Sequence, residues 1–298
     1  MSETIAPEAV APAPPARRRH RRRRSTGATA GRWAVVAGLT CFAISAIMPL
    51  LFMADTAFRT EADWDADKLG LPTTFSLGAF RRAWSGATIN TYFRNSLIVT
   101  LGTVALTIVC ATLAGYAFAK IRWRGSSVAY YFLLAWIAIP PLLLIVPVYV
   151  EIVDLGLLDT YWSVILLYTG LNLPFNIYLM TAFFRGLPDE LLEAARIDGA
   201  GIHRSFLLIM APLARPALAT LAIFNFLWAW NEFLYALLLL TSDSVKTLTV
   251  GVLQLQGRFT TDYPAMMAGL LITSLPVVGV YLIFQRHLVR AIVAGASK

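Results

Sequence analysis

Residues 188–212 read PDELLEAARIDGAGIHRSFLLIMAP and lie between two long apolar segments. The proline and two carboxylates at 188–190 favour the start of a short helix, because proline fits the first turn and carboxylates stabilise the positive end of the helix dipole. Gly199 and Gly201 then interrupt the helix, and a second segment runs from Ile202 into the next apolar stretch. We predict two short helices hinged at glycine and lying at a membrane face, an element that can dock on a partner.

The composition indicates a membrane protein. Hydrophobic residues make up 58% of the 298 residues and charged residues only 14%, and the mean hydropathy is +0.65. A chain with so little polar surface cannot cover itself in water, so we expect lipid to solvate most of it.

Six segments are long and apolar enough to cross a bilayer, which takes about 20 residues. They are Trp33–Ala54, Asn95–Ala119, Ser126–Val150, Tyr161–Phe184, Pro216–Leu240 and Tyr263–Gln285. The chain is therefore predicted to be an all-α polytopic membrane protein with six transmembrane helices. Two adjacent prolines, Pro140 and Pro141, should bend the third helix and free carbonyl groups that protein or water must satisfy.

The distribution of basic residues predicts the orientation. Lysine and arginine concentrate at both chain ends and in the second and fourth loops, whereas the third loop has only Glu151, Asp154 and Asp159. Short loops rich in basic residues stay in the cytoplasm, so both termini and the loop 185–215 are expected there. The first outer loop, residues 55–94, is mixed in charge, but long loops count less in this rule.

The N-terminal segment is rich in alanine and proline and carries seven arginines between positions 17 and 24. Such a composition is typical of a disordered tail. An arginine run can bind nucleic acid, but next to a membrane span it favours a topology signal and a contact with anionic lipid. We therefore expect membrane lipid, and no nucleic acid, as its partner.

The spacing within residues 193–212 resembles the cytoplasmic loop of the membrane subunits of binding-protein-dependent ABC importers. The family pattern is Glu-Ala-Ala, three residues, Gly, nine residues, Ile-x-Leu-Pro. This chain supplies Glu193-Ala194-Ala195, Gly199, Ile209 and Pro212. Ala211 departs from the pattern, since the family usually has leucine at that position.

The similarity covers roughly Leu71 to the C-terminus. It includes Asn95-Ser96-Leu97, Ala114-Gly115-Tyr116-Ala117-Phe118, Asn172-Leu173-Pro174-Phe175 and Trp230-Asn231-Glu232-Phe233. Together these stretches resemble the carbohydrate branch of the family, specifically the second permease of a maltose-type pair.

This resemblance implies the type I ABC importer permease fold and a set of partners. The implied partners are a second permease subunit, a dimer of ATP-binding cassette ATPases and an extracytoplasmic solute-binding protein. The chain would then divide into a disordered cytoplasmic tail (1–31), a first transmembrane helix with its outer loop (32–90), a permease core (91–286) containing the coupling loop 185–215, and a cytoplasmic C-terminal tail (287–298). The location would be the inner membrane of a prokaryotic cell.

The resemblance also implies that the helix around Glu193 inserts into a groove of the ATPase. Ala194 and Ala195 would allow close approach, and Gly199 would make the turn. Asp198 would either cap the following segment or pair with a basic residue of that partner. These five residues are the expected coupling site.

Glu232 is the one acidic residue well inside a predicted span. An ionisable group in hydrocarbon costs roughly 3 kcal/mol or more unless it faces protein or water, so we expect Glu232 to face inward. Trp230, Asn231 and Glu232 together offer an aromatic face, an amide and a carboxylate, a set suited to a sugar ring and its hydroxyls. The alternative is that Glu232 hydrogen-bonds within the bundle or to the partner permease.

Enzymatic chemistry finds little support in the sequence. The three histidines, His20, His203 and His287, do not pair with cysteine or carboxylates at metal-ligand spacing, so no metal and no cofactor is expected. The sequence has no Gly-x-x-x-x-Gly-Lys-Ser/Thr loop to cradle phosphates. ATP would therefore be hydrolysed by a partner chain, and this chain would be a transport subunit rather than an enzyme.

The function predicted from these features is translocation of a carbohydrate by alternating access in an ATP-driven importer. One alternative is an importer of the same class for a polyamine or phosphonate. A second is a proton-coupled secondary transporter with Glu232 as the proton carrier. A third is a membrane-anchored nucleic-acid-binding or scaffold protein that uses the arginine-rich tail.

Overall fold

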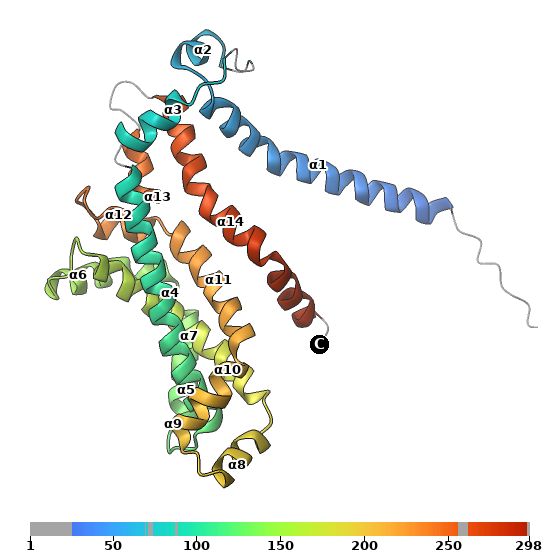
Figure 1. Cartoon of the computed structure of the whole chain (residues 1–298), viewed down its shortest axis with the longest axis vertical. Helices are drawn as coiled ribbons and strands as arrows, with labels where there is room; N and C mark the ends of the chain where they lie inside the picture. The colour runs from blue at the N-terminus through green and yellow to red at the C-terminus, as the bar shows by residue number, and fades with distance from the viewer. Residues whose placement is uncertain (1–25, 69, 71–73, 87–88, 256–261, 297–298) are drawn as a thin grey trace, which may run out of the picture. The chain divides into compact units, whose positions relative to one another are not determined.

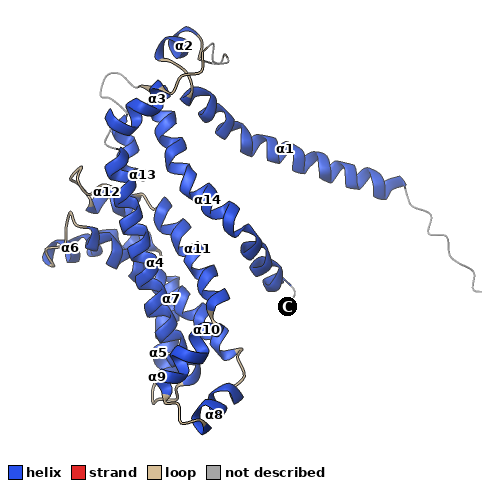
Figure 2. Ribbon diagram, viewed as in Figure 1, coloured by secondary structure: helices blue, strands red, loops and turns tan. Residues whose placement is uncertain are grey.

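The computed structural model describes residues 26–68, 70, 74–86, 89–255 and 262–296, and most of the arginine-rich tail lies outside them. The described residues form helices and connecting turns, and none of them lies in a β-strand (Figure 2). The predicted all-α class is confirmed.

The α-helices, in chain order, are α1 (Thr26–Ala57), α2 (Glu61–Ala66), α3 (Gly78–Arg81), α4 (Ile89–Lys120), α5 (Ser126–Ala135), α6 (Ile145–Asp154), α7 (Tyr161–Arg185), α8 (Glu190–Ile197), α9 (Ile202–Ser205), α10 (Ala211–Leu213), α11 (Arg215–Asn231), α12 (Leu234–Leu239), α13 (Leu248–Gly251) and α14 (Tyr263–Ala296). Short 3₁₀ turns cover Trp136–Ala138, Pro141–Leu144 and Val252–Leu255, and π-helical turns cover Arg82–Gly86 and Phe206–Met210.

The chain divides into two compact units, residues 1–50 and 51–298. The first contains most of α1, whose side chains at 31–50 are all exposed within this chain, including Leu39 and Phe42. So apolar a helix requires lipid or another protein around it. The predicted span Trp33–Ala54 lies inside the apolar stretch Gly31–Ala57.

Four helical stretches among the described residues are long and apolar enough to cross a membrane unbroken. They are Gly31–Ala57, Ile89–Lys120, Tyr161–Arg185 and Tyr263–Gln285. Two further spans are bent pairs, so the count reaches the predicted six if each pair crosses once. α14 itself continues to Ala296, so much of the predicted C-terminal tail 287–298 is an extension of the last helix.

The first bent pair joins Ser126–Ala138 to Pro141–Asp154 at 95°. The break falls at the two prolines, as predicted, and Pro140 has extended backbone angles. The carbonyl of Pro141 accepts a hydrogen bond of 2.6 Å from the hydroxyl of Tyr235, and that of Pro140 accepts one from the amide of Leu143 at 3.0 Å. The bend therefore leaves both of these carbonyl groups satisfied by protein.

The predicted span Pro216–Leu240 begins within one residue of α11, which starts at Arg215, but its predicted end is wrong. The second bent pair joins Ile202–Leu213 to Arg215–Asn231 at 71°, and α11 stops at Asn231. Glu232 is extended, and its carboxylate accepts the amide N–H groups of Tyr235 at 3.0 Å and Ala236 at 3.2 Å. Two N–H groups at the start of α12 that lack helical partners are thereby satisfied, which is why one apolar run makes two helices.

α4 and α7 form the most extensive helix pair of the second unit (Figure 1). α4 presents small buried residues at four-residue steps: Thr103, Thr107, Ala111 and Gly115. A Cβ at Gly115 would lie 2.5 Å from the Cβ of Met180, so the two backbones approach too closely for any larger residue. Small residues serve this close approach in membrane helix pairs.

Asp159 ties the connection between α6 and α7 to the segment after α12. Its backbone has a φ of 63°, and its carboxylate accepts the amides of Thr241 at 2.7 Å and Ser242 at 2.8 Å, together with the Ser242 hydroxyl. Partial burial acts to raise the pKa of Asp159, but these hydrogen bonds outweigh it and lower the pKa below 3.8.

Candidate coupling loop and transport pathway

α8 is amphipathic, with one side packed on its own chain. Leu192 and Ala195 are buried, whereas Ala194 is exposed and Ile197 is 86% exposed. The exposed side also carries the carboxylate of Glu193. An exposed isoleucine on a short surface helix is available to a partner protein.

Two details of the predicted helix differ from expectation. The helix begins at Glu190 with Asp189 as its N-cap, so Pro188 precedes the first turn rather than lying within it. Ala195 packs against its own chain, so of the two alanines only Ala194 lies on the exposed side.

Gly199 ends α8 in a left-handed conformation, with a φ of 78°. The amide of Ala200 donates to the carbonyl of Ala195 at 2.8 Å, and the amide of Gly199 donates to the carbonyl of Arg196 at 3.0 Å. These two bonds form a Schellman motif, which requires a positive φ at the residue after the cap. Asp198 is the C-cap and is exposed.

α9 begins directly after Gly201 and continues through the π-helical turn Phe206–Met210 into α10. Within α9 the Ser205 hydroxyl donates to the Gly201 carbonyl at 3.0 Å. The prediction of two short helices hinged at glycine is confirmed.

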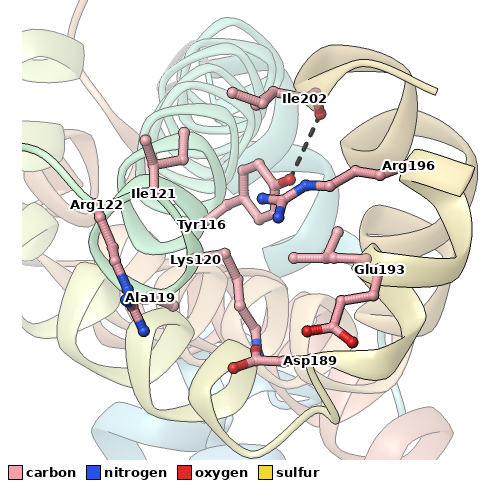
Figure 3. Close-up of a pocket in the computed structure, with 10 residues that line it drawn as sticks. Tyr116, Ala119, Lys120, Ile121, Arg122, Asp189, Glu193, Arg196 and Ile202 are labelled. Carbon is pink, nitrogen blue, oxygen red and sulfur yellow. Dashed lines mark hydrogen bonds and ion pairs between the residues drawn. The ribbon is translucent and has the colours of Figure 1, made fainter. Parts of the chain in front are cut away.

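A cavity of about 550 Å³ lies beneath the loop, between the end of α4 and α8 (Figure 3). Lys120, Arg122 and Arg196 contribute cationic groups to its lining, while Asp189 and Glu193 contribute carboxylates. The Lys120 ammonium, through its hydrogen bond and its charge, holds the pKa of Asp189 below 3.8. The loop is thus joined to α4 by charged as well as apolar contacts.

Trp230 is a packing residue in this structure. Its side chain is 2% exposed, its indole N–H donates to the carbonyl of Thr273 at 3.0 Å, and its ring stacks on Phe226 with centroids 5.7 Å apart. Trp230 therefore exposes almost none of its aromatic face. Asn231, by contrast, is exposed, and its amide donates to the Leu227 carbonyl at 2.7 Å.

Glu232 is half-buried and lies between two helices rather than within one. Besides capping α12, its carboxylate accepts the hydroxyl of Tyr168 from α7. The ring of Tyr168 in turn meets Trp228 edge to face, with centroids 5.3 Å apart. Glu232 therefore bonds to both α7 and α12 at the point where α11 ends.

A groove of about 460 Å³ between α7 and α11 contains residues that the site prediction missed. Phe175, Phe224 and Trp228 expose between 37% and 51% of their surface there. Below them the amides of Asn176 and Asn225 donate to each other at 2.7 Å and 3.2 Å. Asparagines in apolar segments were the available sequence signal, but the pairing of positions 49 residues apart required the fold.

No group of three or more histidine, cysteine, aspartate or glutamate side chains in the described part of the chain is arranged to hold a metal ion.

Comparison with known proteins extends this description. Residues 107–294 match the family described as binding-protein-dependent transport system inner membrane component. The diacetylchitobiose uptake system permease protein NgcG of Streptomyces coelicolor is 34% identical over 262 residues, which is 87% of each chain. The melibiose/raffinose/stachyose import permease protein MelC of Bacillus subtilis is 31% identical, covering 84% of this chain and 91% of that one. A chain from the crystal structure of a bacterial ABC transporter involved in import of the acidic polysaccharide alginate superposes with a TM-score of 0.78 at 23% identity, covering 88% of this chain and 98% of that one.

Proposed function

This chain belongs to the family of binding-protein-dependent transport system inner membrane components, and we propose that it is one of two non-identical permeases of an ATP-driven importer for a carbohydrate. The observation that carries the proposal is the match to sugar permeases over nearly the whole chain. The named substrates of these relatives are oligosaccharides, which supports a sugar over a polyamine or phosphonate.

The proposed energy source is ATP hydrolysis by a dimer of partner subunits. The exposed face of α8 with Glu193, Ala194 and Ile197 would enter a groove of the ATPase, while Leu192 and Ala195 fasten the helix to the permease. Gly199 would hold the turn that follows. When the motor subunits close on ATP, α8 would move with them.

A solute-binding protein would deliver the sugar on the opposite face. Helix movement would then expose the transport cavity alternately to the two sides of the membrane. The proposed lining of that cavity includes Asn231 and Glu232, because polar residues at membrane depth face protein or water rather than lipid. It also includes the exposed rings of the α7–α11 groove instead of the buried Trp230.

The proposed location is the inner membrane of a prokaryotic cell, with both termini and the coupling loop in the cytoplasm. The support is the basic character of those segments. The arginine-rich tail would contribute to this orientation by its attraction to anionic lipid.

The test is uptake into proteoliposomes that contain the permease pair and its ATPase. Radiolabelled diacetylchitobiose and raffinose should be tried with the binding protein outside and ATP inside. We expect uptake to require both the binding protein and ATP, and to continue in the presence of a protonophore. Uptake that collapses with the protonophore but continues without ATP would instead establish a secondary transporter driven by protons.

A further inference from the structure

The last turn of α4 contains a lysine whose side chain is almost completely covered. The side chain of Lys120 is only 4% exposed. Its ammonium donates to the carbonyl of Leu187 at 2.7 Å and to the carboxylate of Asp189 at 2.5 Å. Both acceptors belong to the segment that leads from α7 into α8. A lysine is almost never this buried unless it is paired, so these contacts hold the ammonium in place.

A second contact from the same face of α4 reaches the other arm of the loop. Tyr116 lies one turn before Lys120 and is 5% exposed, and its hydroxyl approaches the carbonyl of Ile202 in α9 at 3.5 Å (Figure 3). Its ring also packs on Phe206, with centroids 5.0 Å apart. Residues four apart share one helix face, so one side of the α4 terminus meets the loop before α8 and after it.

α4 is in turn joined closely to α7. Next to Tyr116, Gly115 lies so near Met180 that a Cβ would come within 3.0 Å of the backbone of α7. Interiors packed this closely have low compressibility and transmit strain. A displacement applied to Lys120 would therefore be transmitted to the α4–α7 pair.

We propose that Lys120 is a positioning residue for coupling. Its hydrogen bonds to Leu187 and Asp189, which we call the Lys120 clamp, transmit the movement of α8 to the α4–α7 pair. The proposal rests on the ATP-driven function proposed above. Attraction of basic residues to the cytoplasmic face explains a lysine in this loop, but not the burial of its side chain or its two oxygen partners. Arg124, four residues further on, is exposed, as expected of a basic residue that is attracted to the cytoplasmic face and has no other role.

The first test compares Lys120→Met with Arg124→Met in the purified importer complex. Each removes one positive charge from the same loop, and methionine keeps most of the buried stem of Lys120. We expect Lys120→Met to retain its ATPase partner but to lower the sugar moved per ATP hydrolysed by on the order of tenfold, the scale of one charge-assisted hydrogen bond. Arg124→Met should match the wild type. An unchanged ratio in Lys120→Met would overturn the proposal.

Asp189→Ala provides a variant that should fold, because the Asp189 side chain is 75% exposed. It should lower the same ratio in part. Combined with Lys120→Met it should add little, since both changes remove one interaction. Fully additive losses would contradict a shared clamp.

A cross-link separates a mechanical role from a merely stabilising one. In the double variant Lys120→Cys with Asp189→Cys, a bifunctional thiol reagent of about lysine length replaces the clamp. If α8 and α4 move as one body, cross-linking restores coupling and reduction of the linker removes it. If cross-linking instead stops transport, α8 must move relative to α4 and the proposal is wrong.

The wild-type complex distinguishes this proposal from the function on which it rests. A wild type without ATP-dependent uptake would refute the proposed importer. A coupled wild type with a normally coupled Lys120→Met would refute the clamp alone.

Discussion

Substitutions at Gly199 measure how much the function of the candidate coupling loop depends on one backbone conformation. Its φ of 78° lies in the left-handed region, and a Cβ added at Gly199 would have no clashing atom of this chain within 4 Å. A substitution at Gly199 therefore strains the backbone without creating a clash inside the permease. The Schellman bonds to Ala195 and Arg196 depend on the same conformation.

The expected cost follows from that geometry. A residue with a Cβ loses about 1–2 kcal/mol in this conformation, and a β-branched residue is a more serious outlier. A change of 1–2 kcal/mol shifts a two-state equilibrium by a factor of about 5–30. Gly199→Val should therefore insert normally but lose most of its sugar-stimulated ATP hydrolysis and uptake.

Gly199→Asn is the matched control. Asparagine is close to valine in size but tolerates the left-handed region far better. If the turn is what matters, activity falls in the order glycine, asparagine, alanine, valine. If close packing against the ATPase dominates, alanine is tolerated better than asparagine, and asparagine behaves like valine. The two orders separate the backbone requirement from the volume requirement.

The assays are pull-down of the ATPase with the purified permease pair and stimulated hydrolysis in proteoliposomes. Full assembly and full stimulated hydrolysis in Gly199→Val would refute a coupling role for the turn. The loop would then be a surface feature whose glycine is dispensable.

Three further outcomes can be measured. An impermeant thiol reagent outside intact cells should label a cysteine at Asp154 and spare one at Glu190, because the basic loops are expected inside; the reverse labelling would invert the topology. Glu232→Gln should fold but transport less, since an amide has one acceptor oxygen where the carboxylate uses two, and a hydrogen bond to a charged group is worth about 1.5–3 kcal/mol. Tyr168→Phe removes only the hydroxyl that Glu232 accepts, and unchanged uptake in both variants would exclude Glu232 from the pathway. Because the pKa of Asp159 is lowered from its ordinary value of 3.8, its stabilising bonds are present well above that value and are lost as the pH falls through the lowered pKa. Hydrogen exchange of the Thr241 and Ser242 amides, corrected for the intrinsic rate, should therefore show equal protection at pH 7 and pH 5, and a loss of protection between them would contradict this assignment.

The spans and the hinge were predictable because each depends on local properties of the chain. Runs of about 20 apolar residues identify membrane helices wherever the fold places them, and the predicted start of the last span, Tyr263, is also the first residue of α14. Gly199 was identified from its position after an amphipathic segment, where left-handed caps are common. Such features need no knowledge of distant residues.

The end of α11 was not predictable in this way. Residues 216–240 carry no charged side chain apart from Glu232, and nothing local requires a break. The break is stabilised by the capping bonds to Tyr235 and Ala236 and by the hydroxyl of Tyr168, which lies 64 residues away. The orientation of Trp230 likewise depends on its partner Thr273 in α14.

In the motif Glu193-Ala194-Ala195, helical periodicity predicts that the two alanines face different neighbours. The spacing of the motif alone does not predict this difference. Successive residues of an α-helix differ by about 100° in direction, so two adjacent alanines cannot both face the same neighbour. Ala195 shares its side with Leu192, three residues earlier, and both are buried against the permease. Ala194 lies on the exposed side with Ile197, three residues later. Ala195 is thus buried within its own chain, whereas Ala194 would face the ATPase in the proposed importer. In that proposed contact α8 would lie between two surfaces, and it would transmit a displacement from one to the other because it would have little freedom to move relative to either.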